Sequence, residues 1–339
     1  IGHKAAINLF RRSLEKGTLS HAYLFVGPEH VGKMTLALNL AQAVNCEAPQ
    51  RPCGQCAACQ KIAAGKHADI QVIELLKPAE VESVGKTKIS VEQIDQILHS
   101  VNLPAFEGKH KVFIIDGFEN LSIPAANRML KTLEEPVSEV LFILLTTREN
   151  FVPKTIVSRC QRVELSPIPY DEIEEALQSR WNVEPLRAKL LARLSVGCLG
   201  WAVNAVENEA LLQQRNEWLD EWAEMLSADN DLRFAFAAKI VEKFNQNRDI
   251  LYQRLDLCAH WWRDALLVKT GNTESITNID REDALIKIAG EYSLGQIHDF
   301  IKRLQTTGAQ LRMNANPQLV MEVLMLNFPE SGKVNNLAK

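Results

Sequence analysis

Residues 27–33, GPEHVGK, combine two glycines and a lysine at the spacing of a phosphate-binding loop. Glycines let backbone amides curl around phosphate oxygens, and the lysine reaches the terminal phosphates of a nucleotide. An apolar run precedes the loop and an alanine-rich segment follows it, which is the strand, loop and helix context that this motif needs. We therefore predict that Gly27, Gly32 and Lys33 bind nucleotide phosphates, with ATP as the candidate ligand.

The residue after the lysine is Met34, where such loops carry the hydroxyl that ligates Mg²⁺. A thioether is a poor ligand for this hard cation. Thr35 is the nearest hydroxyl, but it lies one residue further, about 100° around the following helix. Two interpretations stay open: a loop that holds nucleotide without tight Mg²⁺ binding, and a loop that keeps only its fold.

Hydrolysis of ATP needs a second acidic element at the end of a neighbouring strand. The segment KVFIIDG places Asp116 there, as a candidate to help hold Mg²⁺, although buried strands also end in Asp for structural reasons. The next residue is Gly117, where related P-loop ATPases carry the glutamate that polarises water. We interpret Glu119, two residues further, as a surface charge. Together with Met34, this pattern argues against robust ATP hydrolysis.

Four cysteines follow the loop in a C-x6-C-x2-C-x2-C pattern: Cys46, Cys53, Cys56 and Cys59. The chain shows no secretory signal, and clustered thiolates in a reducing compartment are typical of a tetrahedral Zn²⁺ site. Four protein thiolates leave no open coordination position, so the predicted role of the metal is structural. An iron–sulfur cluster and unligated thiols are the alternatives.

One arginine, Arg159, lies in the segment SRC at the entry to a strand. An arginine at a strand edge is often simply solvated. A guanidinium that projects toward a neighbouring molecule can instead neutralise charge on a γ-phosphate held by that molecule.

Hydrophobic patterning predicts an α/β P-loop domain with a parallel sheet over residues 1–166, with the cysteine module at 46–59 inserted in it. Strands are expected at 21–26, 69–75, 111–115 and 140–147, since their apolar residues occupy nearly every position. Helices are expected at 5–14, after the loop, at 90–102 where Ser90 opens the helix, and before Pro136. Beyond about residue 167 the pattern becomes entirely helical, first in a short module to residue 208 and then in long amphipathic helices over 209–339.

The overall charge sets limits on partners. The chain has 339 residues and a formal net charge of −4, so no global attraction to nucleic acid or to anionic lipid is expected. Contact with DNA must then be local or made through partners. No apolar run approaches the ~20 residues of a membrane span, and we expect a cytoplasmic protein without a membrane partner.

Several segments together carry a family resemblance over nearly the whole chain: SHAYLFVGPEHVGK, the four-cysteine insert, NRMLKTLEEP, LFILLTT and SRC. The chain resembles the bacterial clamp-loader subunits of DNA polymerase III, which are AAA+ ATPases. The resemblance implies an AAA+ domain at 1–166, a helical lid at 167–208, and a helical collar at 209–339 through which subunits form a ring. It also implies the partners: gamma or tau and delta subunits, the sliding clamp indirectly, and primed DNA through the complex, in a nucleoid-associated replisome.

Within this family the motor subunits, gamma and tau, have an intact loop, an Asp-Glu pair and a lid arginine. This chain departs from them at Met34, Gly117 and Gly200, and so resembles a non-motor, stator-like subunit. By resemblance, Arg159 acts in trans on a neighbour's ATP, and Thr147 occupies the position of the polar residue called sensor 1. Residues 131–136 belong to a helix that the family uses at the subunit interface, or form an ordinary capped helix.

Three alternatives remain. An active gamma-type motor would tolerate Met34, with Thr35 serving Mg²⁺. A P-loop nucleotide kinase is disfavoured, because no arginine-rich lid follows the P-loop domain. A regulatory module would bind ATP without turning it over.

Overall fold

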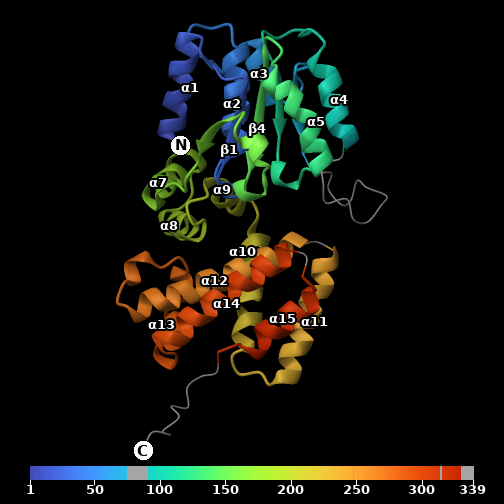
Figure 1. Ribbon diagram of the computed structural model, residues 1–339. Coiled ribbons are helices and arrows are strands. Elements are labelled where there is room, and N and C mark those ends of the chain that lie inside the picture. Colours follow the sequence, from blue (N-terminus) through green and yellow to red (C-terminus); the bar gives the residue numbers. More distant parts are fainter. Residues whose placement is uncertain (75–90, 247, 314, 330–339) are drawn as a thin grey trace, which may run out of the picture. The chain divides into compact units, whose positions relative to one another are not determined.

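The computed structural model describes residues 1–74, 91–246, 248–313 and 315–329 (Figure 1). Contacts between residues divide the chain into two compact units, Ile1–Ile173 with Gly197–Trp201 and Glu174–Val196 with Ala202–Lys339. The three-domain boundaries expected from the sequence remain a prediction. Each unit is described by itself below.

A five-stranded sheet forms the centre of the first unit (Figure 1). All its strand pairs are parallel, and the order is β2-β3-β4-β1-β5. This confirms the predicted parallel α/β fold. The strands are β1 (Ala22–Val26), β2 (Ile70–Ile73), β3 (Lys111–Ile115), β4 (Val140–Thr146) and β5 (Gln161–Glu164).

Helices cover both faces of this sheet. Alternate residues of a strand point to opposite faces, and since the central strands are apolar at successive positions, both faces must be buried. On one face Tyr23 and Phe25 pack with residues of α1, α2 and α3, and on the other Leu24 and Phe142 pack with residues of α4, α5 and α6. Every residue of β3 and β4 is buried, as expected of strands covered on both sides. The helices and 3₁₀ turns are α1 (Lys4–Lys16), α2 (Lys33–Asn45), α3 (Ala57–Ala63), α4 (Val91–Val101), η2 (Phe118–Asn120), α5 (Ile123–Glu134), η3 (Glu149–Phe151) and α6 (Lys154–Val157).

The predicted elements of this unit are confirmed within a few residues at each end. Ser90, which the sequence assigned to the start of α4, and Leu75, at the end of the expected second strand, lie outside the described residues. Helix α5 begins with Ser122 as its N-cap, whose side chain accepts the N–H of Ala125. It ends at Glu134, just before Pro136.

Residues beyond the sheet are helical, as predicted. The second unit has a core of large side chains from several helices, in which Trp222 stacks on Phe328 at 5.9 Å and Phe300 meets Phe328 at 4.8 Å between ring centroids. The elements are α7 (Tyr170–Trp181), α8 (Pro185–Leu194), α9 (Leu199–Glu207), α10 (Glu209–Glu224), α11 (Asn230–Gln246), α12 (Arg248–Lys269), η4 (Thr273–Ser275), η5 (Ile279–Arg281), α13 (Glu282–Glu291), α14 (Leu294–Arg312) and α15 (Pro317–Leu326). Helices α7 and α9 each have residues in both units. Among the described helices, none combines the length and the apolar character that crossing a membrane requires.

Candidate functional site

The phosphate-loop motif lies between β1 and α2, as its sequence predicts. Gly27 follows β1, and a Cβ atom at this position would lie 2.5 Å from the carbonyl oxygen of Leu165, so only glycine fits. Gly32 is the N-cap of α2 and has φ 112°, a conformation that favours glycine. Glycines therefore set the backbone path at both ends of the loop. The loop leads directly into the N-terminus of α2, whose free N–H groups favour an anion.

Lys33 is the first residue of α2 and braces the loop. Its side chain crosses the loop, and Nζ donates to the carbonyl oxygens of Gly27 at 2.8 Å and Pro28 at 2.7 Å. The residue is 8% exposed. Burial lowers the pKa of Lys33, while the carboxylates of Asp116 and Glu119 oppose that shift. These two acids therefore lie near enough to act on the loop lysine.

The two residues after Lys33 have different surroundings. Met34 is partly buried and packs against the hydrophobic cluster beneath α1 and α2. Thr35 is exposed on α2, so the structure does not bury its hydroxyl with the other candidate residues. Neither side chain is placed as a buried oxygen ligand beside Lys33. A role for Thr35 in nucleotide binding stays a prediction.

Asp116 follows β3 at the carboxyl edge of the sheet. Its N–H donates to the carbonyl of Ile73 at 2.9 Å, and its Oδ1 accepts the N–H of Gly117 at 2.9 Å. Gly117 has φ 66° and turns the chain into η2. A glutamate in this left-handed conformation would be strained, so the backbone at position 117 favours glycine.

Glu119 on η2 corrects the interpretation from sequence. It is not a surface charge, because its side chain is 4% exposed. Thr147 donates to its Oε1 through the hydroxyl at 2.5 Å and through the backbone N–H at 3.2 Å. Burial raises the pKa of Glu119, but these hydrogen bonds outweigh burial and hold the pKa below its usual value. Glu119 is thus a buried, ionised partner of Thr147.

The backbone connects Thr147 to the phosphate loop. Thr146, the last residue of β4, accepts the N–H of Gly27 through its carbonyl at 3.2 Å. The carboxyl ends of β3, β4 and β1 are neighbours in the sheet, so Asp116, Thr147 and Gly27 lie along one edge. The structure therefore brings together most of the predicted nucleotide-binding residues, with Glu119 as a member that the sequence did not reveal.

Gly200 packs directly on the phosphate loop, within the first unit. Its N–H donates to the carbonyl of His30 at 2.9 Å. A Cβ atom at this position would lie 2.8 Å from the same oxygen. No side chain, and so no arginine, fits at position 200 without moving the loop.

Arg159 lies between α6 and β5, and acceptors of its own chain hold its guanidinium. Nη1 donates to the carbonyl of Thr155 at 2.8 Å and to Ser158 Oγ at 3.3 Å, and Nη2 donates to Glu134 at the end of α5. The side chain is 31% exposed. Its Nε is buried without a hydrogen-bond partner among the described residues. The sequence pointed to the helix that carries Glu134 but did not show that this residue holds the arginine.

The four cysteines lie together as their spacing predicts. Their Sγ atoms all lie within 4.8 Å of one another, and the Sγ atoms of Cys46 and Cys56 are 3.9 Å apart. A tetrahedral ion with Zn–S distances near 2.3 Å places its sulfur ligands roughly 3.8 Å apart. The cluster has the size and the donor set for Zn²⁺.

Cys53 and Cys59 of this cluster differ in their pKa values. The N–H groups of Gln55 and Cys56 point at the sulfur of Cys53, at 3.4 and 3.3 Å, and lower the pKa of Cys53 to about 6. Burial raises the pKa of Cys59 to about 12, so a cation is needed to keep that thiol ionised at neutral pH. A structural Zn²⁺ would supply that charge.

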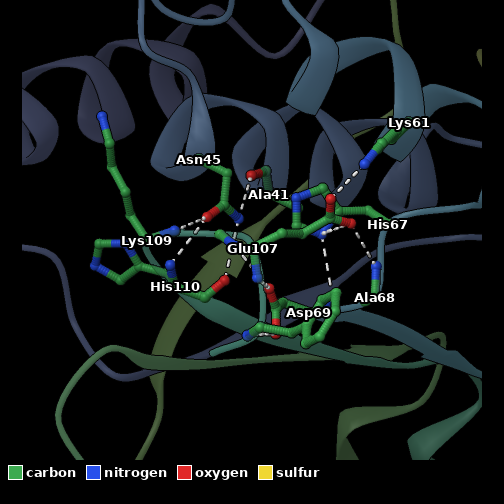
Figure 2. Close-up of polar contacts among 11 residues, drawn as sticks. Ala41, Asn45, Lys61, His67, Ala68, Asp69, Glu107, Lys109 and His110 are labelled. Atoms are coloured by element: carbon green, nitrogen blue, oxygen red, sulfur yellow. Dashed lines mark hydrogen bonds and ion pairs between the residues drawn. The ribbon is translucent and has the colours of Figure 1, made fainter. Parts of the chain in front are cut away.

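Figure 2 shows the polar network that holds the first end of the cysteine module. Asn45 is the last residue of α2 and precedes Cys46. Its Oδ1 accepts the N–H groups of Lys109 at 2.8 Å and His110 at 2.9 Å, and its Nδ2 donates to Ala41 and His110 carbonyls. The module is thereby attached to the loop that leads into β3.

Asp69 holds the other side of the same loop (Figure 2). Its carboxylate accepts the N–H groups of Phe106, Glu107 and Gly108 at 2.7, 2.8 and 2.7 Å. Lys61 of α3 pairs with Glu107. Neither Asn45 nor Asp69 belongs to a short motif, and the hydrogen-bond partners of their side chains, other than Ala41, lie 37 to 65 residues away, so no local pattern predicts this network.

The fold and this arrangement define a class of protein. A parallel sheet with a phosphate loop after β1, an acid after β3 and a polar residue after β4 is an α/β domain of the P-loop class.

Comparison of the sequence with known proteins identifies the family. Residues 2–169 match the family model described as DNA polymerase III, delta subunit, and residues 209–330 match the model of its C-terminal part. The delta-prime subunit of Bacillus subtilis is 28% identical over 325 residues, which cover 96% of this chain and 95% of that protein. The chain therefore belongs to the clamp-loader subunits of bacterial DNA polymerase III, of the delta-prime type.

The tau and gamma relatives are matched over less of their own length than the delta-prime subunit. The tau subunit of Escherichia coli is 34% identical over 214 residues, 61% of this chain, but this chain spans only 32% of that tau subunit. A solved gamma-subunit-related protein from Thermotoga maritima superposes with a TM-score of 0.41 at 18% identity, over 94% of this chain and 97% of the other. That structural likeness is loose.

Proposed function

We propose that this chain works in a clamp loader as a stator-like delta-prime subunit that supports ATP-dependent loading of the sliding clamp onto primed DNA. Its direct partners are the gamma or tau and delta subunits, and it meets the clamp and DNA through the complex. It works in the cytoplasm at the replisome. Its part in ATP hydrolysis is to present Arg159 to nucleotide bound by a neighbouring subunit.

The surroundings of Arg159 carry this proposal. A side chain that completes another subunit's site must be fixed in direction and still reach the surface. Thr155, Ser158 and Glu134 fix the guanidinium, and the side chain keeps 31% of its surface exposed. A guanidinium that meets a γ-phosphate in this way stabilises charge in the transition state.

The chain's own nucleotide pocket supports a non-motor role. Met34 offers no oxygen to Mg²⁺, and Gly117 offers no carboxylate to polarise water. Gly200 leaves no room for an arginine over the loop. Three parts of a working ATPase are therefore replaced by residues that cannot perform the chemistry.

Zinc has a separate, structural role in this proposal. One Zn²⁺ would be held by Cys46, Cys53, Cys56 and Cys59. It would stabilise the module at 46–59, in which Cys46 and Cys59 are the only buried residues. The ion takes no part in hydrolysis, since four thiolates leave no position for water.

A motor-type gamma or tau subunit is the weaker candidate. This chain matches the tau and gamma relatives over 25 to 73% of their own length, against 95% for the delta-prime subunit. The same three replaced positions argue against it.

Reconstitution tests the proposal. The isolated chain, given ATP, Mg²⁺ and primed DNA, should show no turnover, and it should co-purify with the gamma or tau and delta subunits. A complex assembled without it should lose most of its clamp loading. DNA-stimulated turnover by the isolated chain that Lys33→Ala abolishes would instead establish a motor.

A further inference from the structure

We propose that Glu119 keeps the terminal phosphate of a nucleoside triphosphate out of the phosphate-loop pocket, so that this pocket takes a nucleoside diphosphate in preference. The inference rests on the proposed nucleotide site but not on the role of Arg159. It concerns the one buried acid of this site that the proposed function leaves unused.

The loop itself is ready for a diphosphate. Lys33 uses two ammonium N–H groups to brace the carbonyls of Gly27 and Pro28, which leaves one N–H beyond these two bonds. Gly32 begins α2, whose N-terminal amides favour an anion. These are the groups that hold the phosphates nearest the loop, and none of them has been replaced.

The position beyond those phosphates is different. Thr147 directly follows β4, at the edge of the sheet that also carries Gly27 and Asp116. Ligands of parallel α/β sheets bind outside this carboxyl edge, so the outer phosphate would extend from the loop toward Thr147. Both of its donors, the hydroxyl and the backbone N–H, already bond to Glu119 Oε1. Glu119 thus takes the acceptor role that a terminal phosphate oxygen would have.

The negative charge of Glu119 disfavours a terminal phosphate beside it. Glu119 is ionised and 4% exposed, and its Oε2 is buried with no hydrogen-bond partner in the described part of the chain. Arg148 Nε lies 3.7 Å from Oε1, the oxygen that already accepts the Thr147 hydrogen bonds, and so it pairs with that oxygen. A triphosphate would bring its terminal charge toward this carboxylate in a poorly solvated place, while the β-phosphate stays at Lys33.

Magnesium does not relieve the repulsion. The cation normally bridges the outer phosphates and is held by the hydroxyl after the loop lysine. That residue is Met34, which packs into the hydrophobic cluster of α1 and α2. A diphosphate depends less on this cation, so the same replacement favours it.

Calorimetric titration of the full-length chain with ADP and with ATP, each with and without Mg²⁺, tests the inference. The wild-type chain should bind ADP at least about tenfold more tightly than ATP, as expected for one unit charge at short range in a partly buried site. Glu119→Gln keeps the Oε1 acceptor for Thr147 and removes the charge, so ATP affinity should rise by about tenfold while ADP affinity changes little.

Glu149→Gln is the matched control. Glu149 lies two residues after Thr147, and its carboxylate pairs with Arg162. This variant removes one negative charge of the same type and should leave the ratio of ADP to ATP affinity unchanged. Lys33→Ala should abolish ADP binding, which assigns the measured heat to this loop.

Three results would overturn the inference. They are equal affinity of the wild-type chain for ADP and ATP, an unchanged ratio in Glu119→Gln, and no binding of either nucleotide to the wild-type chain. If Glu119→Gln is not folded by circular dichroism, Glu119→Ser removes the same charge and is judged by the same ratio. Since these titrations use the isolated chain, a clamp loader that assembles without needing this subunit would refute the proposed function and leave the nucleotide preference standing.

Discussion

Asp69 belongs to no known motif, yet we predict that it contributes strongly to the free energy of unfolding of the first unit. Its carboxylate, on a residue 3% exposed, accepts backbone N–H groups of Phe106, Glu107 and Gly108. Asp69→Asn keeps one acceptor oxygen, which can serve the two donors at the Oδ2 position, and it places its NH₂ group against the N–H of Phe106 at the Oδ1 position. A hydrogen bond to a charged group contributes about 1.5–3 kcal/mol, so losing one of them and the charge that strengthens the other two should lower the free energy of unfolding by about 3 kcal/mol.

Asp95→Asn provides the control for this substitution. Asp95 pairs with Arg128 at 3.0 Å on the surface, where the two side chains are 44% and 57% exposed. An ion pair in such a place contributes about 0–1 kcal/mol. Urea unfolding with the metal bound gives the two free energies, and hydrogen exchange of the peptide that contains residues 106–108 reports the local effect. If Asp69→Asn costs no more than Asp95→Asn, the argument from the three N–H groups is wrong.

The same carboxylate predicts a pH dependence. Burial raises the pKa of Asp69, but the three N–H groups outweigh it and hold the pKa below its usual value. A lowered pKa in the folded state adds stability above the unfolded pKa of about 3.9, and that stability is lost as pH falls through the folded value. The difference between wild type and Asp69→Asn should therefore be constant near neutral pH and shrink below about pH 4.

Three further outcomes follow from the sites described above. Protein purified without added zinc should contain about one Zn²⁺ per chain by elemental analysis, and Cys56→Ser should lose it; a metal-free wild type that folds normally would refute the metal site. Glu134→Gln should change the free energy of unfolding by less than about 1 kcal/mol, because its ion pair with Arg159 is partly exposed. The same variant should lower the ATPase activity of the complex about threefold, because Arg159 loses one of the groups that hold it. A rise in ATPase activity would contradict that positioning role. Gly200→Arg should lower the melting temperature, since its Cβ would lie 2.8 Å from the His30 carbonyl oxygen, and regained ATP turnover in this variant would contradict our account of the loop.

Local patterns predicted the fold of the first unit well. Apolar strands such as β3 and β4 are buried at every position, and their order along the chain with intervening helices leads to a parallel sheet. The phosphate loop and the four cysteines were also readable, because each is a short motif whose chemistry fixes its spacing.

The roles of other residues depend on contacts between distant parts of the chain, which the spacing of residues in the sequence does not predict. Glu119 was interpreted as a surface charge, but the left-handed turn at Gly117 carries it inward to Thr147, 28 residues away. Glu134 reaches Arg159 from 25 residues away, through the packing of α5 beside α6. A glycine directly after a buried strand is the sequence signal for a sharp turn, and such a turn argues against placing the following charge on the surface.

The ATPase of the assembled clamp loader with Arg159→Ala in this chain is the most direct test of our central claim. The variant removes the guanidinium and should fold normally, since the ion pair that Arg159 makes in the described structure joins two partly exposed side chains, its own and that of Glu134. Arg162→Ala, three residues further on a surface pair with Glu149, is the control. We predict that Arg159→Ala lowers DNA-stimulated ATP hydrolysis of the complex severalfold or more while Arg162→Ala leaves it unchanged. Equal ATPase for the complex with Arg159→Ala and the wild-type complex would contradict the claim that this subunit completes a neighbour's active site.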